Sequence, residues 1–428
     1  MLMVLLGTYI AWREIPPYEP WLRQAYVAGN ALFDPTDEYS SDVWMEEPAS
    51  TSPEVGIIVW DKERASPGLT LITAGEGAHL LDMNGEVVHS WSYAYDELPA
   101  EGRMVAETVQ VRRYWQRAHV LPNGDIVVMM NMTRSSPDGL ALIRLDKDSN
   151  LLWHRYGYFH HDFDLDKAGN IYALDQSILT ETPDALPTMR APVLDEAVVV
   201  LSPDGELMAR HSIVDAISRS RYTQFIKRFV HENSEHWGDY MHNNNVDVAD
   251  TDTAALFPFV NEGDILLSMR EVDSLAVLDP REGRLTWAAR GSWHRQHDPD
   301  FLPNGNLLIF DNKGDWERDG HSRVIEYHPA TGAIVWQYPD KGTGRLHSDY
   351  RAEQQWLPNN NILINEFTKR RLLEVTRDGD TVWEYRCHLR YEVDPDLLCR
   401  AMSSQRYSYS ELEFVGRRIA AATGPAVQ

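Results

Sequence analysis

The hydrophobic pattern along the chain repeats one unit six times: an apolar strand, a turn containing Asp or Gly, and a second strand that usually ends in tryptophan. The copies lie at residues 80–91, 143–153, 199–209, 276–287, 325–336 and 373–383. Two short apolar strands joined by such a turn predict a β-hairpin. Repetition at a period of tens of residues is typical of a solenoid or a propeller.

A second phrase, a Pro/Asn/Gly turn followed by an alternating apolar strand, precedes several of these hairpins. It occurs at residues 118–129, 161–174, 297–312 and 354–367. Adding its strands to a hairpin fills one propeller blade, and six blades close into a ring without long exposed edges. Successive tryptophans at Trp287, Trp336 and Trp383 are 49 and 47 residues apart, the length of one four-stranded blade. The pattern therefore predicts an all-β protein with a six-bladed β-propeller over residues 68–390.

The remaining residues divide into three segments. Residues 1–20 begin with an apolar stretch that turns polar at Arg13. This stretch is shorter than the roughly 20 residues that span a bilayer, and it lacks both a basic start and a small-residue cleavage site. We interpret it as an uncleaved or truncated membrane anchor or signal-like segment, with a buried N-terminal helix as the alternative. Residues 21–67 are assigned to a linker and 391–428 to a C-terminal extension.

Charge and cysteine content limit the partners. The chain has 65 acidic and 40 basic residues, a net charge of −25, which argues against nucleic acid or an anionic membrane surface as a partner. An anionic substrate would need a local pocket of Arg and His. The only cysteines, Cys387 and Cys399, are too few for a disulfide framework or a cysteine-based metal site. They form either one local disulfide or two free thiols.

Candidate chemistry lies just before the predicted innermost strands, because these positions converge at the mouth of a propeller channel. The candidates are His160, His161, His242, Asn244, Arg270, His297, His347 and Ser348. His161 and His297 each precede a turn glycine by eight residues, so they occupy equivalent positions of two blades. Any one of these histidines could instead be a structural residue bonded to backbone. The matched register favours a shared position at the channel.

Several motifs resemble those of the bacterial PAPS-independent arylsulfate sulfotransferases. These are HNNNVD at residues 242–247, ILLSMR at 265–270, QHDPDFLPNGNLLIFDN at 296–312 and SRVIEYHPATGAIVWQYP at 322–339. The resemblance covers about residues 153–385 and implies a ping-pong transfer from an aryl sulfate donor to a phenolic acceptor. It implies His297 as the nucleophile, with His242, Asn244 and Arg270 as ligands of the transferred group. It implies His161 as a further channel histidine, and His347 and Ser348 match more weakly. His160, the neighbour of His161, is a substrate-binding candidate from its position.

The chemistry independently suits these residue types. A neutral imidazole is nucleophilic near pH 7 and can carry a transferable group. Arg270 offers a planar fork for two oxygens, and Asn244 offers an NH₂ donor. A second histidine, when protonated, can release the phenolate. The scheme requires neither a metal nor a cofactor.

Two departures from the family pattern affect the functional prediction. Met269 stands where a small or polar residue is usual, and Lys313 stands where glycine is usual. We also find no counterpart of the family's N-terminal β-domain.

The sequence predicts an exported, membrane-anchored sulfotransferase at the periplasmic or extracellular face. The alternative is a non-catalytic propeller that serves as an accessory or interaction subunit of a membrane protein complex.

Overall fold

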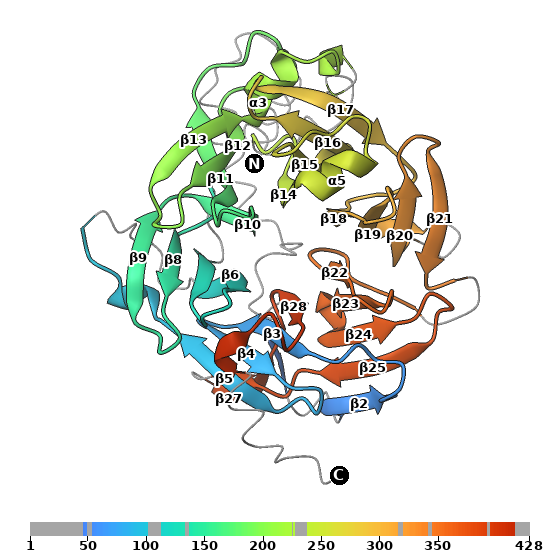
Figure 1. Cartoon of the computed structure of the whole chain (residues 1–428). Helices are drawn as coiled ribbons and strands as arrows, with labels where there is room; N and C mark the ends of the chain where they lie inside the picture. Colours follow the sequence, from blue (N-terminus) through green and yellow to red (C-terminus); the bar gives the residue numbers. More distant parts are fainter. Residues whose placement is uncertain are drawn as a thin grey trace, which may run out of the picture. The chain divides into compact units, whose positions relative to one another are not determined.

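The computed structural model confirms the all-β, six-bladed propeller. It describes residues 46–48, 54–101, 113–132, 137–224, 226, 238–315, 320–340, 345–391 and 394–415. Within these ranges, six antiparallel sheets of four or five strands surround a central axis (Figure 1). The predicted N-terminal segment 1–20 and most of the predicted linker lie outside the described residues.

The strands of each blade follow one another from the central axis to the rim (Figure 1). The first three blades comprise β28 (Ser404–Tyr407), β3 (Leu69–Ala74), β4 (Gly77–Leu81) and β5 (Val87–Ser92); β6 (Arg113–Val120), β7 (Ile126–Met132), β8 (Ala141–Leu145) and β9 (Leu151–Tyr156); β10 (Phe159–Leu165), β11 (Ile171–Leu179), β12 (Val193–Leu201) and β13 (Leu207–Ser212). The others comprise β14 (Asn243–Val248), β15 (Ile265–Met269), β16 (Ser274–Asp279) and β17 (Arg284–Arg290); β18 (His297–Phe301), β19 (Leu307–Asp315), β20 (His321–His328) and β21 (Ala333–Tyr338); β22 (Glu353–Trp356), β23 (Ile362–Glu366), β24 (Arg371–Val375), β25 (Thr381–Arg386) and β2 (Gly56–Trp60).

The six predicted hairpins form outer strand pairs of the six blades, for example β4–β5 and β24–β25. Their tryptophans join neighbouring blades. The indole Nε1–H donates to a turn carbonyl of the next blade in four copies: Trp91 to Gly124, Trp153 to Pro203, Trp336 to Arg377 and Trp383 to Met83. A buried indole needs such an acceptor, so the repeated residue fixes the spacing between blades as well as filling space.

The ring is closed by strands from both ends of the propeller sequence. β28 comes from the predicted C-terminal extension and pairs with β3 as the innermost strand of its blade. β2 comes from the predicted linker and pairs with β25 as a fifth, outer strand. The propeller therefore extends beyond the predicted range 68–390 at both ends. Pairing the two ends in this way covers the free strand edges that an open ring would expose.

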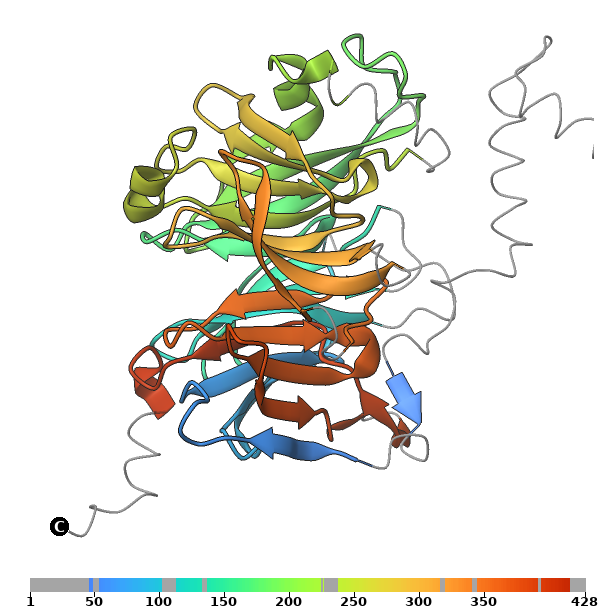
Figure 2. The same cartoon turned by 90° about the vertical axis from the view of Figure 1, so that its right-hand side faces the viewer.

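Short elements complete the described structure. A three-stranded sheet of β1 (Glu46–Pro48), β27 (Asp394–Cys399) and β26 (Arg390–Tyr391) lies at one face of the ring (Figure 2). Helical segments in these ranges include η3 (Tyr95–Glu97), α3 (Ile213–Ser218), α5 (Thr251–Leu256), η4 (Arg270–Val272) and η6 (Phe367–Lys369). No helix among the described residues is long and apolar enough to cross a membrane.

Apolar side chains pack between the blades. Trp91, Trp115 and Trp383 are fully buried there. Cys387 and Cys399 lie in the same apolar cluster as Trp383, and both are buried thiols that form no disulfide with each other. Of the two alternatives, the local disulfide is therefore absent from this structure.

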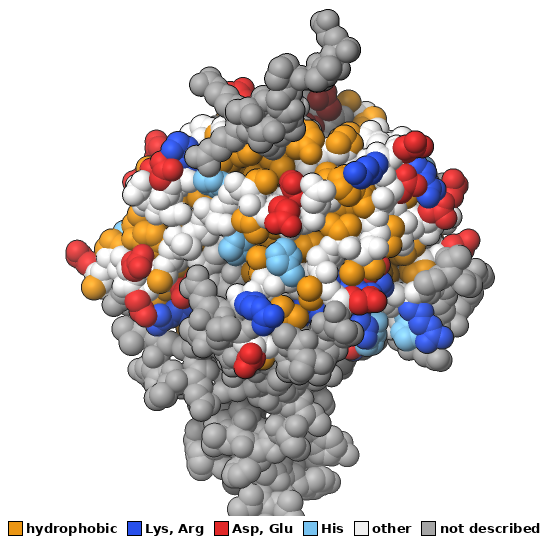
Figure 3. Space-filling view, turned by 90° about the horizontal axis from the view of Figure 1, so that it is seen from below, with side chains coloured by type: hydrophobic (Ala, Val, Ile, Leu, Met, Phe, Trp, Pro, Cys, Tyr) orange, Lys and Arg blue, Asp and Glu red, His pale blue; other side chains and the backbone are white. Residues whose placement is uncertain are grey.

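The outer surface mixes charge types. On the side of the ring shown in Figure 3, acidic, basic and hydrophobic side chains are interspersed. Many exposed carboxylates have a basic neighbour, as in the ion pair of Arg284 Nε with Glu282. The excess of acidic residues is therefore not gathered into one patch on this side.

Candidate active site

The innermost strands of three neighbouring blades begin with a β-bulge. The register shifts between Phe159 and Phe163 in β10, between Asn243 and Val246 in β14, and between His297 and Asp300 in β18. Extra residues in a strand re-aim the side chains around them. The predicted histidines and Asn244 of the three blades lie at or beside these bulges. The bulge in each strand therefore turns these side chains toward the channel.

Two of these residues have a backbone conformation that non-glycine residues rarely adopt. The φ angles of His161 and His242 are +60° and +50°. A side chain in this left-handed region costs of the order of 1 kcal/mol or more, and such residues cluster at functional sites. The strain is offset here by contacts of both imidazoles with buried polar groups.

The hydrogen bonds of His297 define its tautomer. Its Nδ1 lies 2.8 Å from Asn312 Oδ1 and 3.1 Å from the Arg295 carbonyl oxygen. The amide of Asn312 is oriented by its Nδ2, which donates to the carbonyl oxygens of Ser348 and Arg351, both at 2.8 Å. Both atoms facing Nδ1 are therefore acceptors, so Nδ1 carries the proton. The lone pair of the neutral ring resides on Nε2.

The surroundings of His297 also keep its ring neutral. Burial lowers the pKa of His297 well below its usual value, and the positive charge of Arg270 lowers it further. The hydrogen bond from Nδ1 to Asn312 acts in the opposite direction but is outweighed. Only the neutral ring has a lone pair for attack, so this environment maintains a nucleophile at neutral pH.

Three imidazoles form a hydrogen-bonded row that ends on a carboxylate, which we call the histidine row. His160 Nδ1 lies 2.7 Å from His161 Nδ1, His161 Nε2 lies 3.1 Å from His242 Nε2, and His242 Nδ1 contacts Asp239 Oδ2 at 2.5 Å. Burial would raise the pKa of Asp239, but His242 outweighs it and the net shift is downward. Asp239 is therefore an ionised acceptor at the end of the row.

The histidine row can store and move a proton. Burial, reinforced by the charge of His242, lowers the pKa of His160 to about 3 and that of His161 well below its usual value. A hydrogen bond between two ring nitrogens holds one proton. A proton gained at His161 can therefore pass to His242, where the Asp239 carboxylate stabilises the imidazolium.

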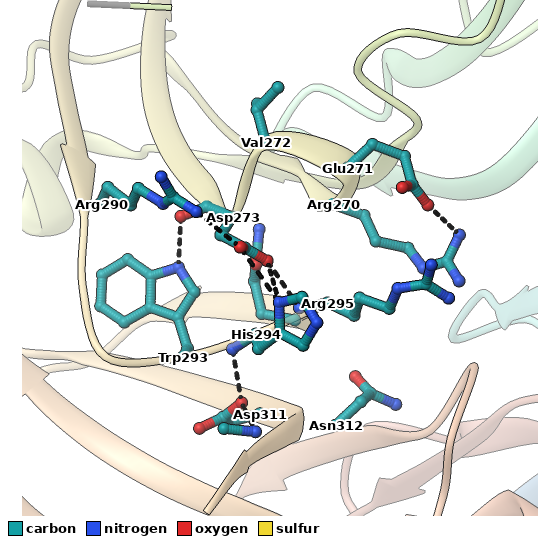
Figure 4. A network of polar contacts seen from close by, with 12 residues as sticks. Arg270, Glu271, Val272, Asp273, Arg290, Trp293, His294, Arg295, Asp311 and Asn312 are labelled. Carbon is teal, nitrogen blue, oxygen red and sulfur yellow. Dashed lines mark hydrogen bonds and ion pairs between the residues drawn. The ribbon is translucent and has the colours of Figure 1, made fainter. Parts of the chain in front are cut away.

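Arg270 is a buried arginine that directly follows β15. Its backbone N–H donates to the His242 carbonyl oxygen at 3.1 Å, and its guanidinium contacts Glu271 Oε1 at 2.8 Å (Figure 4). It is 3% exposed. The structure thus places the predicted Arg270 beside the histidine row and within electrostatic reach of His297.

The segment that leads into β18 is fixed by Asp273 (Figure 4). The carboxylate of Asp273 accepts from Arg290 Nη2, from His294 Nδ1 and from the Arg295 backbone N–H, each at 2.9 Å. Its carbonyl oxygen accepts from the Trp293 indole at 2.9 Å. One residue of the neighbouring blade therefore sets the approach of the strand that bears the candidate nucleophile.

Arg295 was not among the predicted site residues. Its carbonyl oxygen accepts from His297 Nδ1, and its own φ angle is +56°. Its guanidinium makes no ion pair with a described residue, and Figure 4 shows its side chain extending in the direction of Arg270. Its one sequence signal is its position, two residues before the candidate nucleophile.

A small cavity, which we call the reaction cavity, brings together three of the predicted residues, His161, Asn244 and His297, whereas His160, His242 and Arg270 do not line it. It holds about 30 Å³ and is lined by Gln116, Arg117, His161, Asp162, Asn244, His297, Asp298, Arg351, Ala352, Glu353 and Met402. This is space for about two water molecules. An aryl sulfate must therefore place its ring outside the cavity or displace side chains at its mouth.

The predicted Asn244 reaches the reaction cavity with part of its amide committed. Its Nδ2 donates to the Gln296 carbonyl oxygen at 2.9 Å. Its Oδ1 is buried and has no hydrogen-bond partner among the described residues. Asn244 can therefore offer one remaining N–H to a ligand and also accept a hydrogen bond, which the sequence did not indicate.

Ser348 and His347 do not line the reaction cavity. The carbonyl oxygen of Ser348 holds Asn312, and its hydroxyl donates to the Tyr350 carbonyl oxygen at 3.0 Å. Ser348 therefore supports the partner of His297 from behind. His347 lines a different pocket, which is described below.

Arg117 separates the reaction cavity from a larger acidic hollow. The hollow holds about 440 Å³, and its lining includes Asp164, Asp247, Asp298, Asp300 and Glu353. Arg117 pairs with Asp162 at 2.6 Å, Glu353 at 3.2 Å and Asp298 at 3.6 Å. Three carboxyl groups thus share one cation, and the two hollows have Arg117, Asp298 and Glu353 in common.

These buried carboxylates predict a pH-dependent stability. Burial raises the pKa of Glu353 from 4.5 to about 8. As the pH rises, the unfolded chain loses this proton first, so the stabilisation is complete below pH 4.5 and is lost progressively up to about pH 8. We expect Tm to fall by a few degrees across this interval.

Thermal unfolding measured at several pH values should show a smaller change of Tm with pH for Glu353→Gln than for the wild type. The exposed control Glu206→Gln should keep the wild-type slope, and equal slopes in all three proteins would contradict the prediction.

No metal site accompanies these residues in the part of the chain that the structure describes: no group of three or more His, Cys, Asp or Glu side chains is arranged to hold a metal ion. The site residues that the sequence analysis missed are Asn312, Asp239 and Arg295. Asn312 stood in a quoted motif, but without an assigned role.

Solved structures similar to the chain include a protein of unknown function from Bacteroides caccae, with 12% identity, 75% of this chain and 94% of that chain covered, and a TM-score of 0.45. A catalytically inactive virginiamycin B lyase from Staphylococcus aureus with quinupristin has 6% identity, 78% and 88% coverage, and a TM-score of 0.41. A streptogramin B lyase has 12% identity, 87% and 97% coverage, and a TM-score of 0.41. These likenesses are too distant to carry an argument about function.

No curated protein matches the chain at a significant level. The family model described as arylsulfotransferase (ASST) matches residues 117–388. This range contains the histidine row, Arg270, His297 and Asn312. The chain therefore belongs to the arylsulfotransferase family.

Proposed function

We propose that the protein transfers a sulfuryl group from an aryl sulfate to a phenolic acceptor through a covalent sulfo-histidine at His297. Membership of the family supports the reaction class, with an aryl donor and a phenolic acceptor. The observation that carries the covalent step is the pair of acceptors at His297 Nδ1, the Asn312 amide oxygen and the Arg295 carbonyl oxygen. They leave Nε2 as the nucleophile.

In the first half-reaction, the lone pair of His297 Nε2 attacks the sulfur of the donor. A nitrogen–sulfur bond forms as the bond from sulfur to the aryl oxygen breaks, and the bonding electrons leave with that oxygen. Because Nδ1 keeps its proton, the product is a sulfoimidazolium, whose ring nitrogen is a good leaving group. The hydrogen bond from Nδ1 to Asn312 Oδ1, at 2.8 Å, holds the ring through this change.

The histidine row supplies and recovers the proton. Before the transfer, the row holds one proton more than three neutral rings carry, as the His242 imidazolium beside the Asp239 carboxylate. His161, which lines the reaction cavity, relays this proton to the departing aryl oxygen, and all three rings are then neutral. Both ring nitrogens of His161 are engaged, so this transfer requires one of its contacts to open. In the second half-reaction, the acceptor phenol returns a proton to His161 as its oxygen attacks the sulfur and the nitrogen–sulfur bond breaks.

Cations and donors stabilise the transferred group between its two partners. In sulfuryl transfer, as in phosphoryl transfer, the protein mainly positions the group and offers charge to its outer oxygens. We assign this role to Arg270 and to the remaining N–H of Asn244. Apolar surface for the aryl ring comes from Met402, which lines the reaction cavity and packs against Tyr114 and Phe367.

Export and membrane attachment belong to the proposal as well. They rest on the apolar segment 1–20, which lies outside the described residues. In this proposal the enzyme works at the periplasmic or extracellular face, on donors and acceptors that need not enter the cell.

The sulfo-histidine is testable by mass spectrometry of the intact chain. Brief exposure to an aryl sulfate without acceptor, at neutral pH, should add the mass of one sulfuryl group, and peptide mapping should place it on His297. Adding a phenol should remove the label, and the His297→Ala variant should never acquire it. Label on another residue would overturn the assignment of the nucleophile, and rapid turnover without any label would overturn the covalent step.

A further inference from the structure

A second pocket, separate from the reaction cavity, concentrates positive charge in this acidic protein, and we call it the basic pocket. It holds about 610 Å³ and is lined by His321, Arg345, His347, Glu366, Thr368, Lys369, Arg370, Arg371, Arg386 and Arg400. It shares no lining residue with the reaction cavity. Its lining supplies six Lys and Arg side chains and one carboxylate, whereas the whole chain carries a net charge of −25.

The cations come from four separate stretches of the chain. Three successive ones, Lys369, Arg370 and Arg371, line the same pocket although neighbouring side chains of a strand point to opposite faces. The turn makes this possible, because η6 ends at Lys369 and Arg370 follows with a φ angle of +55°. Arg386 at the end of β25 and Arg400 after β27 complete the cationic wall.

Local carboxylates account for only part of this charge. Arg371 pairs with Glu366 and, at 3.8 Å, with Glu384, whereas Arg386 pairs with Glu384 at 3.0 Å and with Glu54 at 3.4 Å. Lys369 and Arg345 make no ion pair with a described residue. Like charges gathered in one concave site repel one another unless an anion neutralises them, and a concave wall focuses the resulting field. The arrangement is therefore the one expected of an anion site.

We propose that the basic pocket binds a small polyanion, a molecule with two or more sulfate, phosphate or carboxylate groups. The volume admits such a molecule, and the spread of cations over several sides of the pocket suits more than one anionic group. Arginine forks are the donors that recognise these groups. His347 belongs to this site and not to the reaction cavity. The proposal does not depend on the proposed reaction.

The site adjoins the support of His297. The segment from Arg345 to Ala352 contributes Arg345 and His347 to the basic pocket and Arg351 to the reaction cavity. Within it, the carbonyl oxygens of Ser348 and Arg351 hold Asn312. A ligand in the basic pocket therefore contacts the same segment that orients the partner of the nucleophile.

Isothermal titration of the full chain with inorganic pyrophosphate, at low ionic strength, tests the proposal. We expect one site per chain. The double variant Arg345→Glu with Lys369→Glu should bind pyrophosphate at least about tenfold more weakly, because two exposed cations of the pocket become anions. Neither residue is ion-paired within the described ranges, so folding should be preserved, which circular dichroism can verify.

Two controls locate the binding. The double variant Lys147→Glu with Lys167→Glu makes the same charge change on other blades and should bind as the wild type does. The His297→Ala variant should also bind normally, because the reaction cavity is separate. Absence of binding to the wild type, or equal weakening by the two double variants, would overturn the proposal. Loss of binding in His297→Ala alone would place pyrophosphate in the reaction cavity and would overturn it as well.

Discussion

Replacing His297 with alanine should lower kcat for sulfuryl transfer by at least about 1,000-fold, because His161, the other imidazole that lines the reaction cavity, has both ring nitrogens engaged in hydrogen bonds. Release of a chromogenic phenol from its sulfate, in the presence of a phenolic acceptor, measures the effect. Burial lowers the pKa of the wild-type ring, so the lost nucleophile is one that was unprotonated at neutral pH.

The matched control is His328→Ala. His328 ends β20 and lines none of the described cavities, so its removal should leave kcat within about twofold of the wild type, as is usual for a surface substitution. Activity of His297→Ala above about a tenth of the wild-type value would contradict a covalent role. A folded wild-type protein without any turnover would instead favour the accessory-subunit alternative.

The sequence predicted the propeller because each blade carries its own local signal. The turns and tryptophans of the six hairpins are short-range features, and they appear in the structure as outer strand pairs. The closure of the ring has no such signal. β28 is four residues long, and Ser403 just before it bonds Thr73, which is 330 positions earlier. Pairing over such a separation depends on how the whole ring closes, which no local pattern encodes.

The candidate site was predictable to the extent that it follows blade register. His161 and His297 were placed at equivalent positions, and both line one cavity. The groups that define their protonation were not predictable. Asn312 faces His297 only because the segment that precedes β22 supplies two carbonyl oxygens to its amide. A motif shows which residue types are present, but not which atoms they face.

His347 shows where prediction from sequence position failed. Its position just before an innermost strand and its weak family match both placed it with the substrate ligands. In the structure its ring meets that of His321 with centroids 5.8 Å apart, in the basic pocket. Residues before an innermost strand approach the same face of the ring, but the two sides of a segment can line different pockets. Sequence position alone does not select the side.

Arg270→Lys should lower kcat by about 10²-fold while KM changes little. Lysine keeps the charge but lacks the planar fork that can hold two oxygens as charge develops on the transferred group. An interaction that strengthens only in the transition state affects kcat and kcat/KM together, and this split distinguishes it from ordinary substrate binding. Steady-state kinetics with a chromogenic aryl sulfate supplies both constants.

Two comparisons separate this role from simple neutralisation of Glu271, which Arg270 contacts at 2.8 Å. Arg144→Lys alters another partly buried, ion-paired arginine, on a different blade, and should leave kcat unchanged. If Arg270 only neutralised its neighbour, Arg270→Lys would remain nearly as active as the wild type, because an ammonium also pairs with a carboxylate. A large loss in Arg270→Lys with a preserved Tm therefore requires the fork itself, acting on the group that passes between donor, His297 and acceptor.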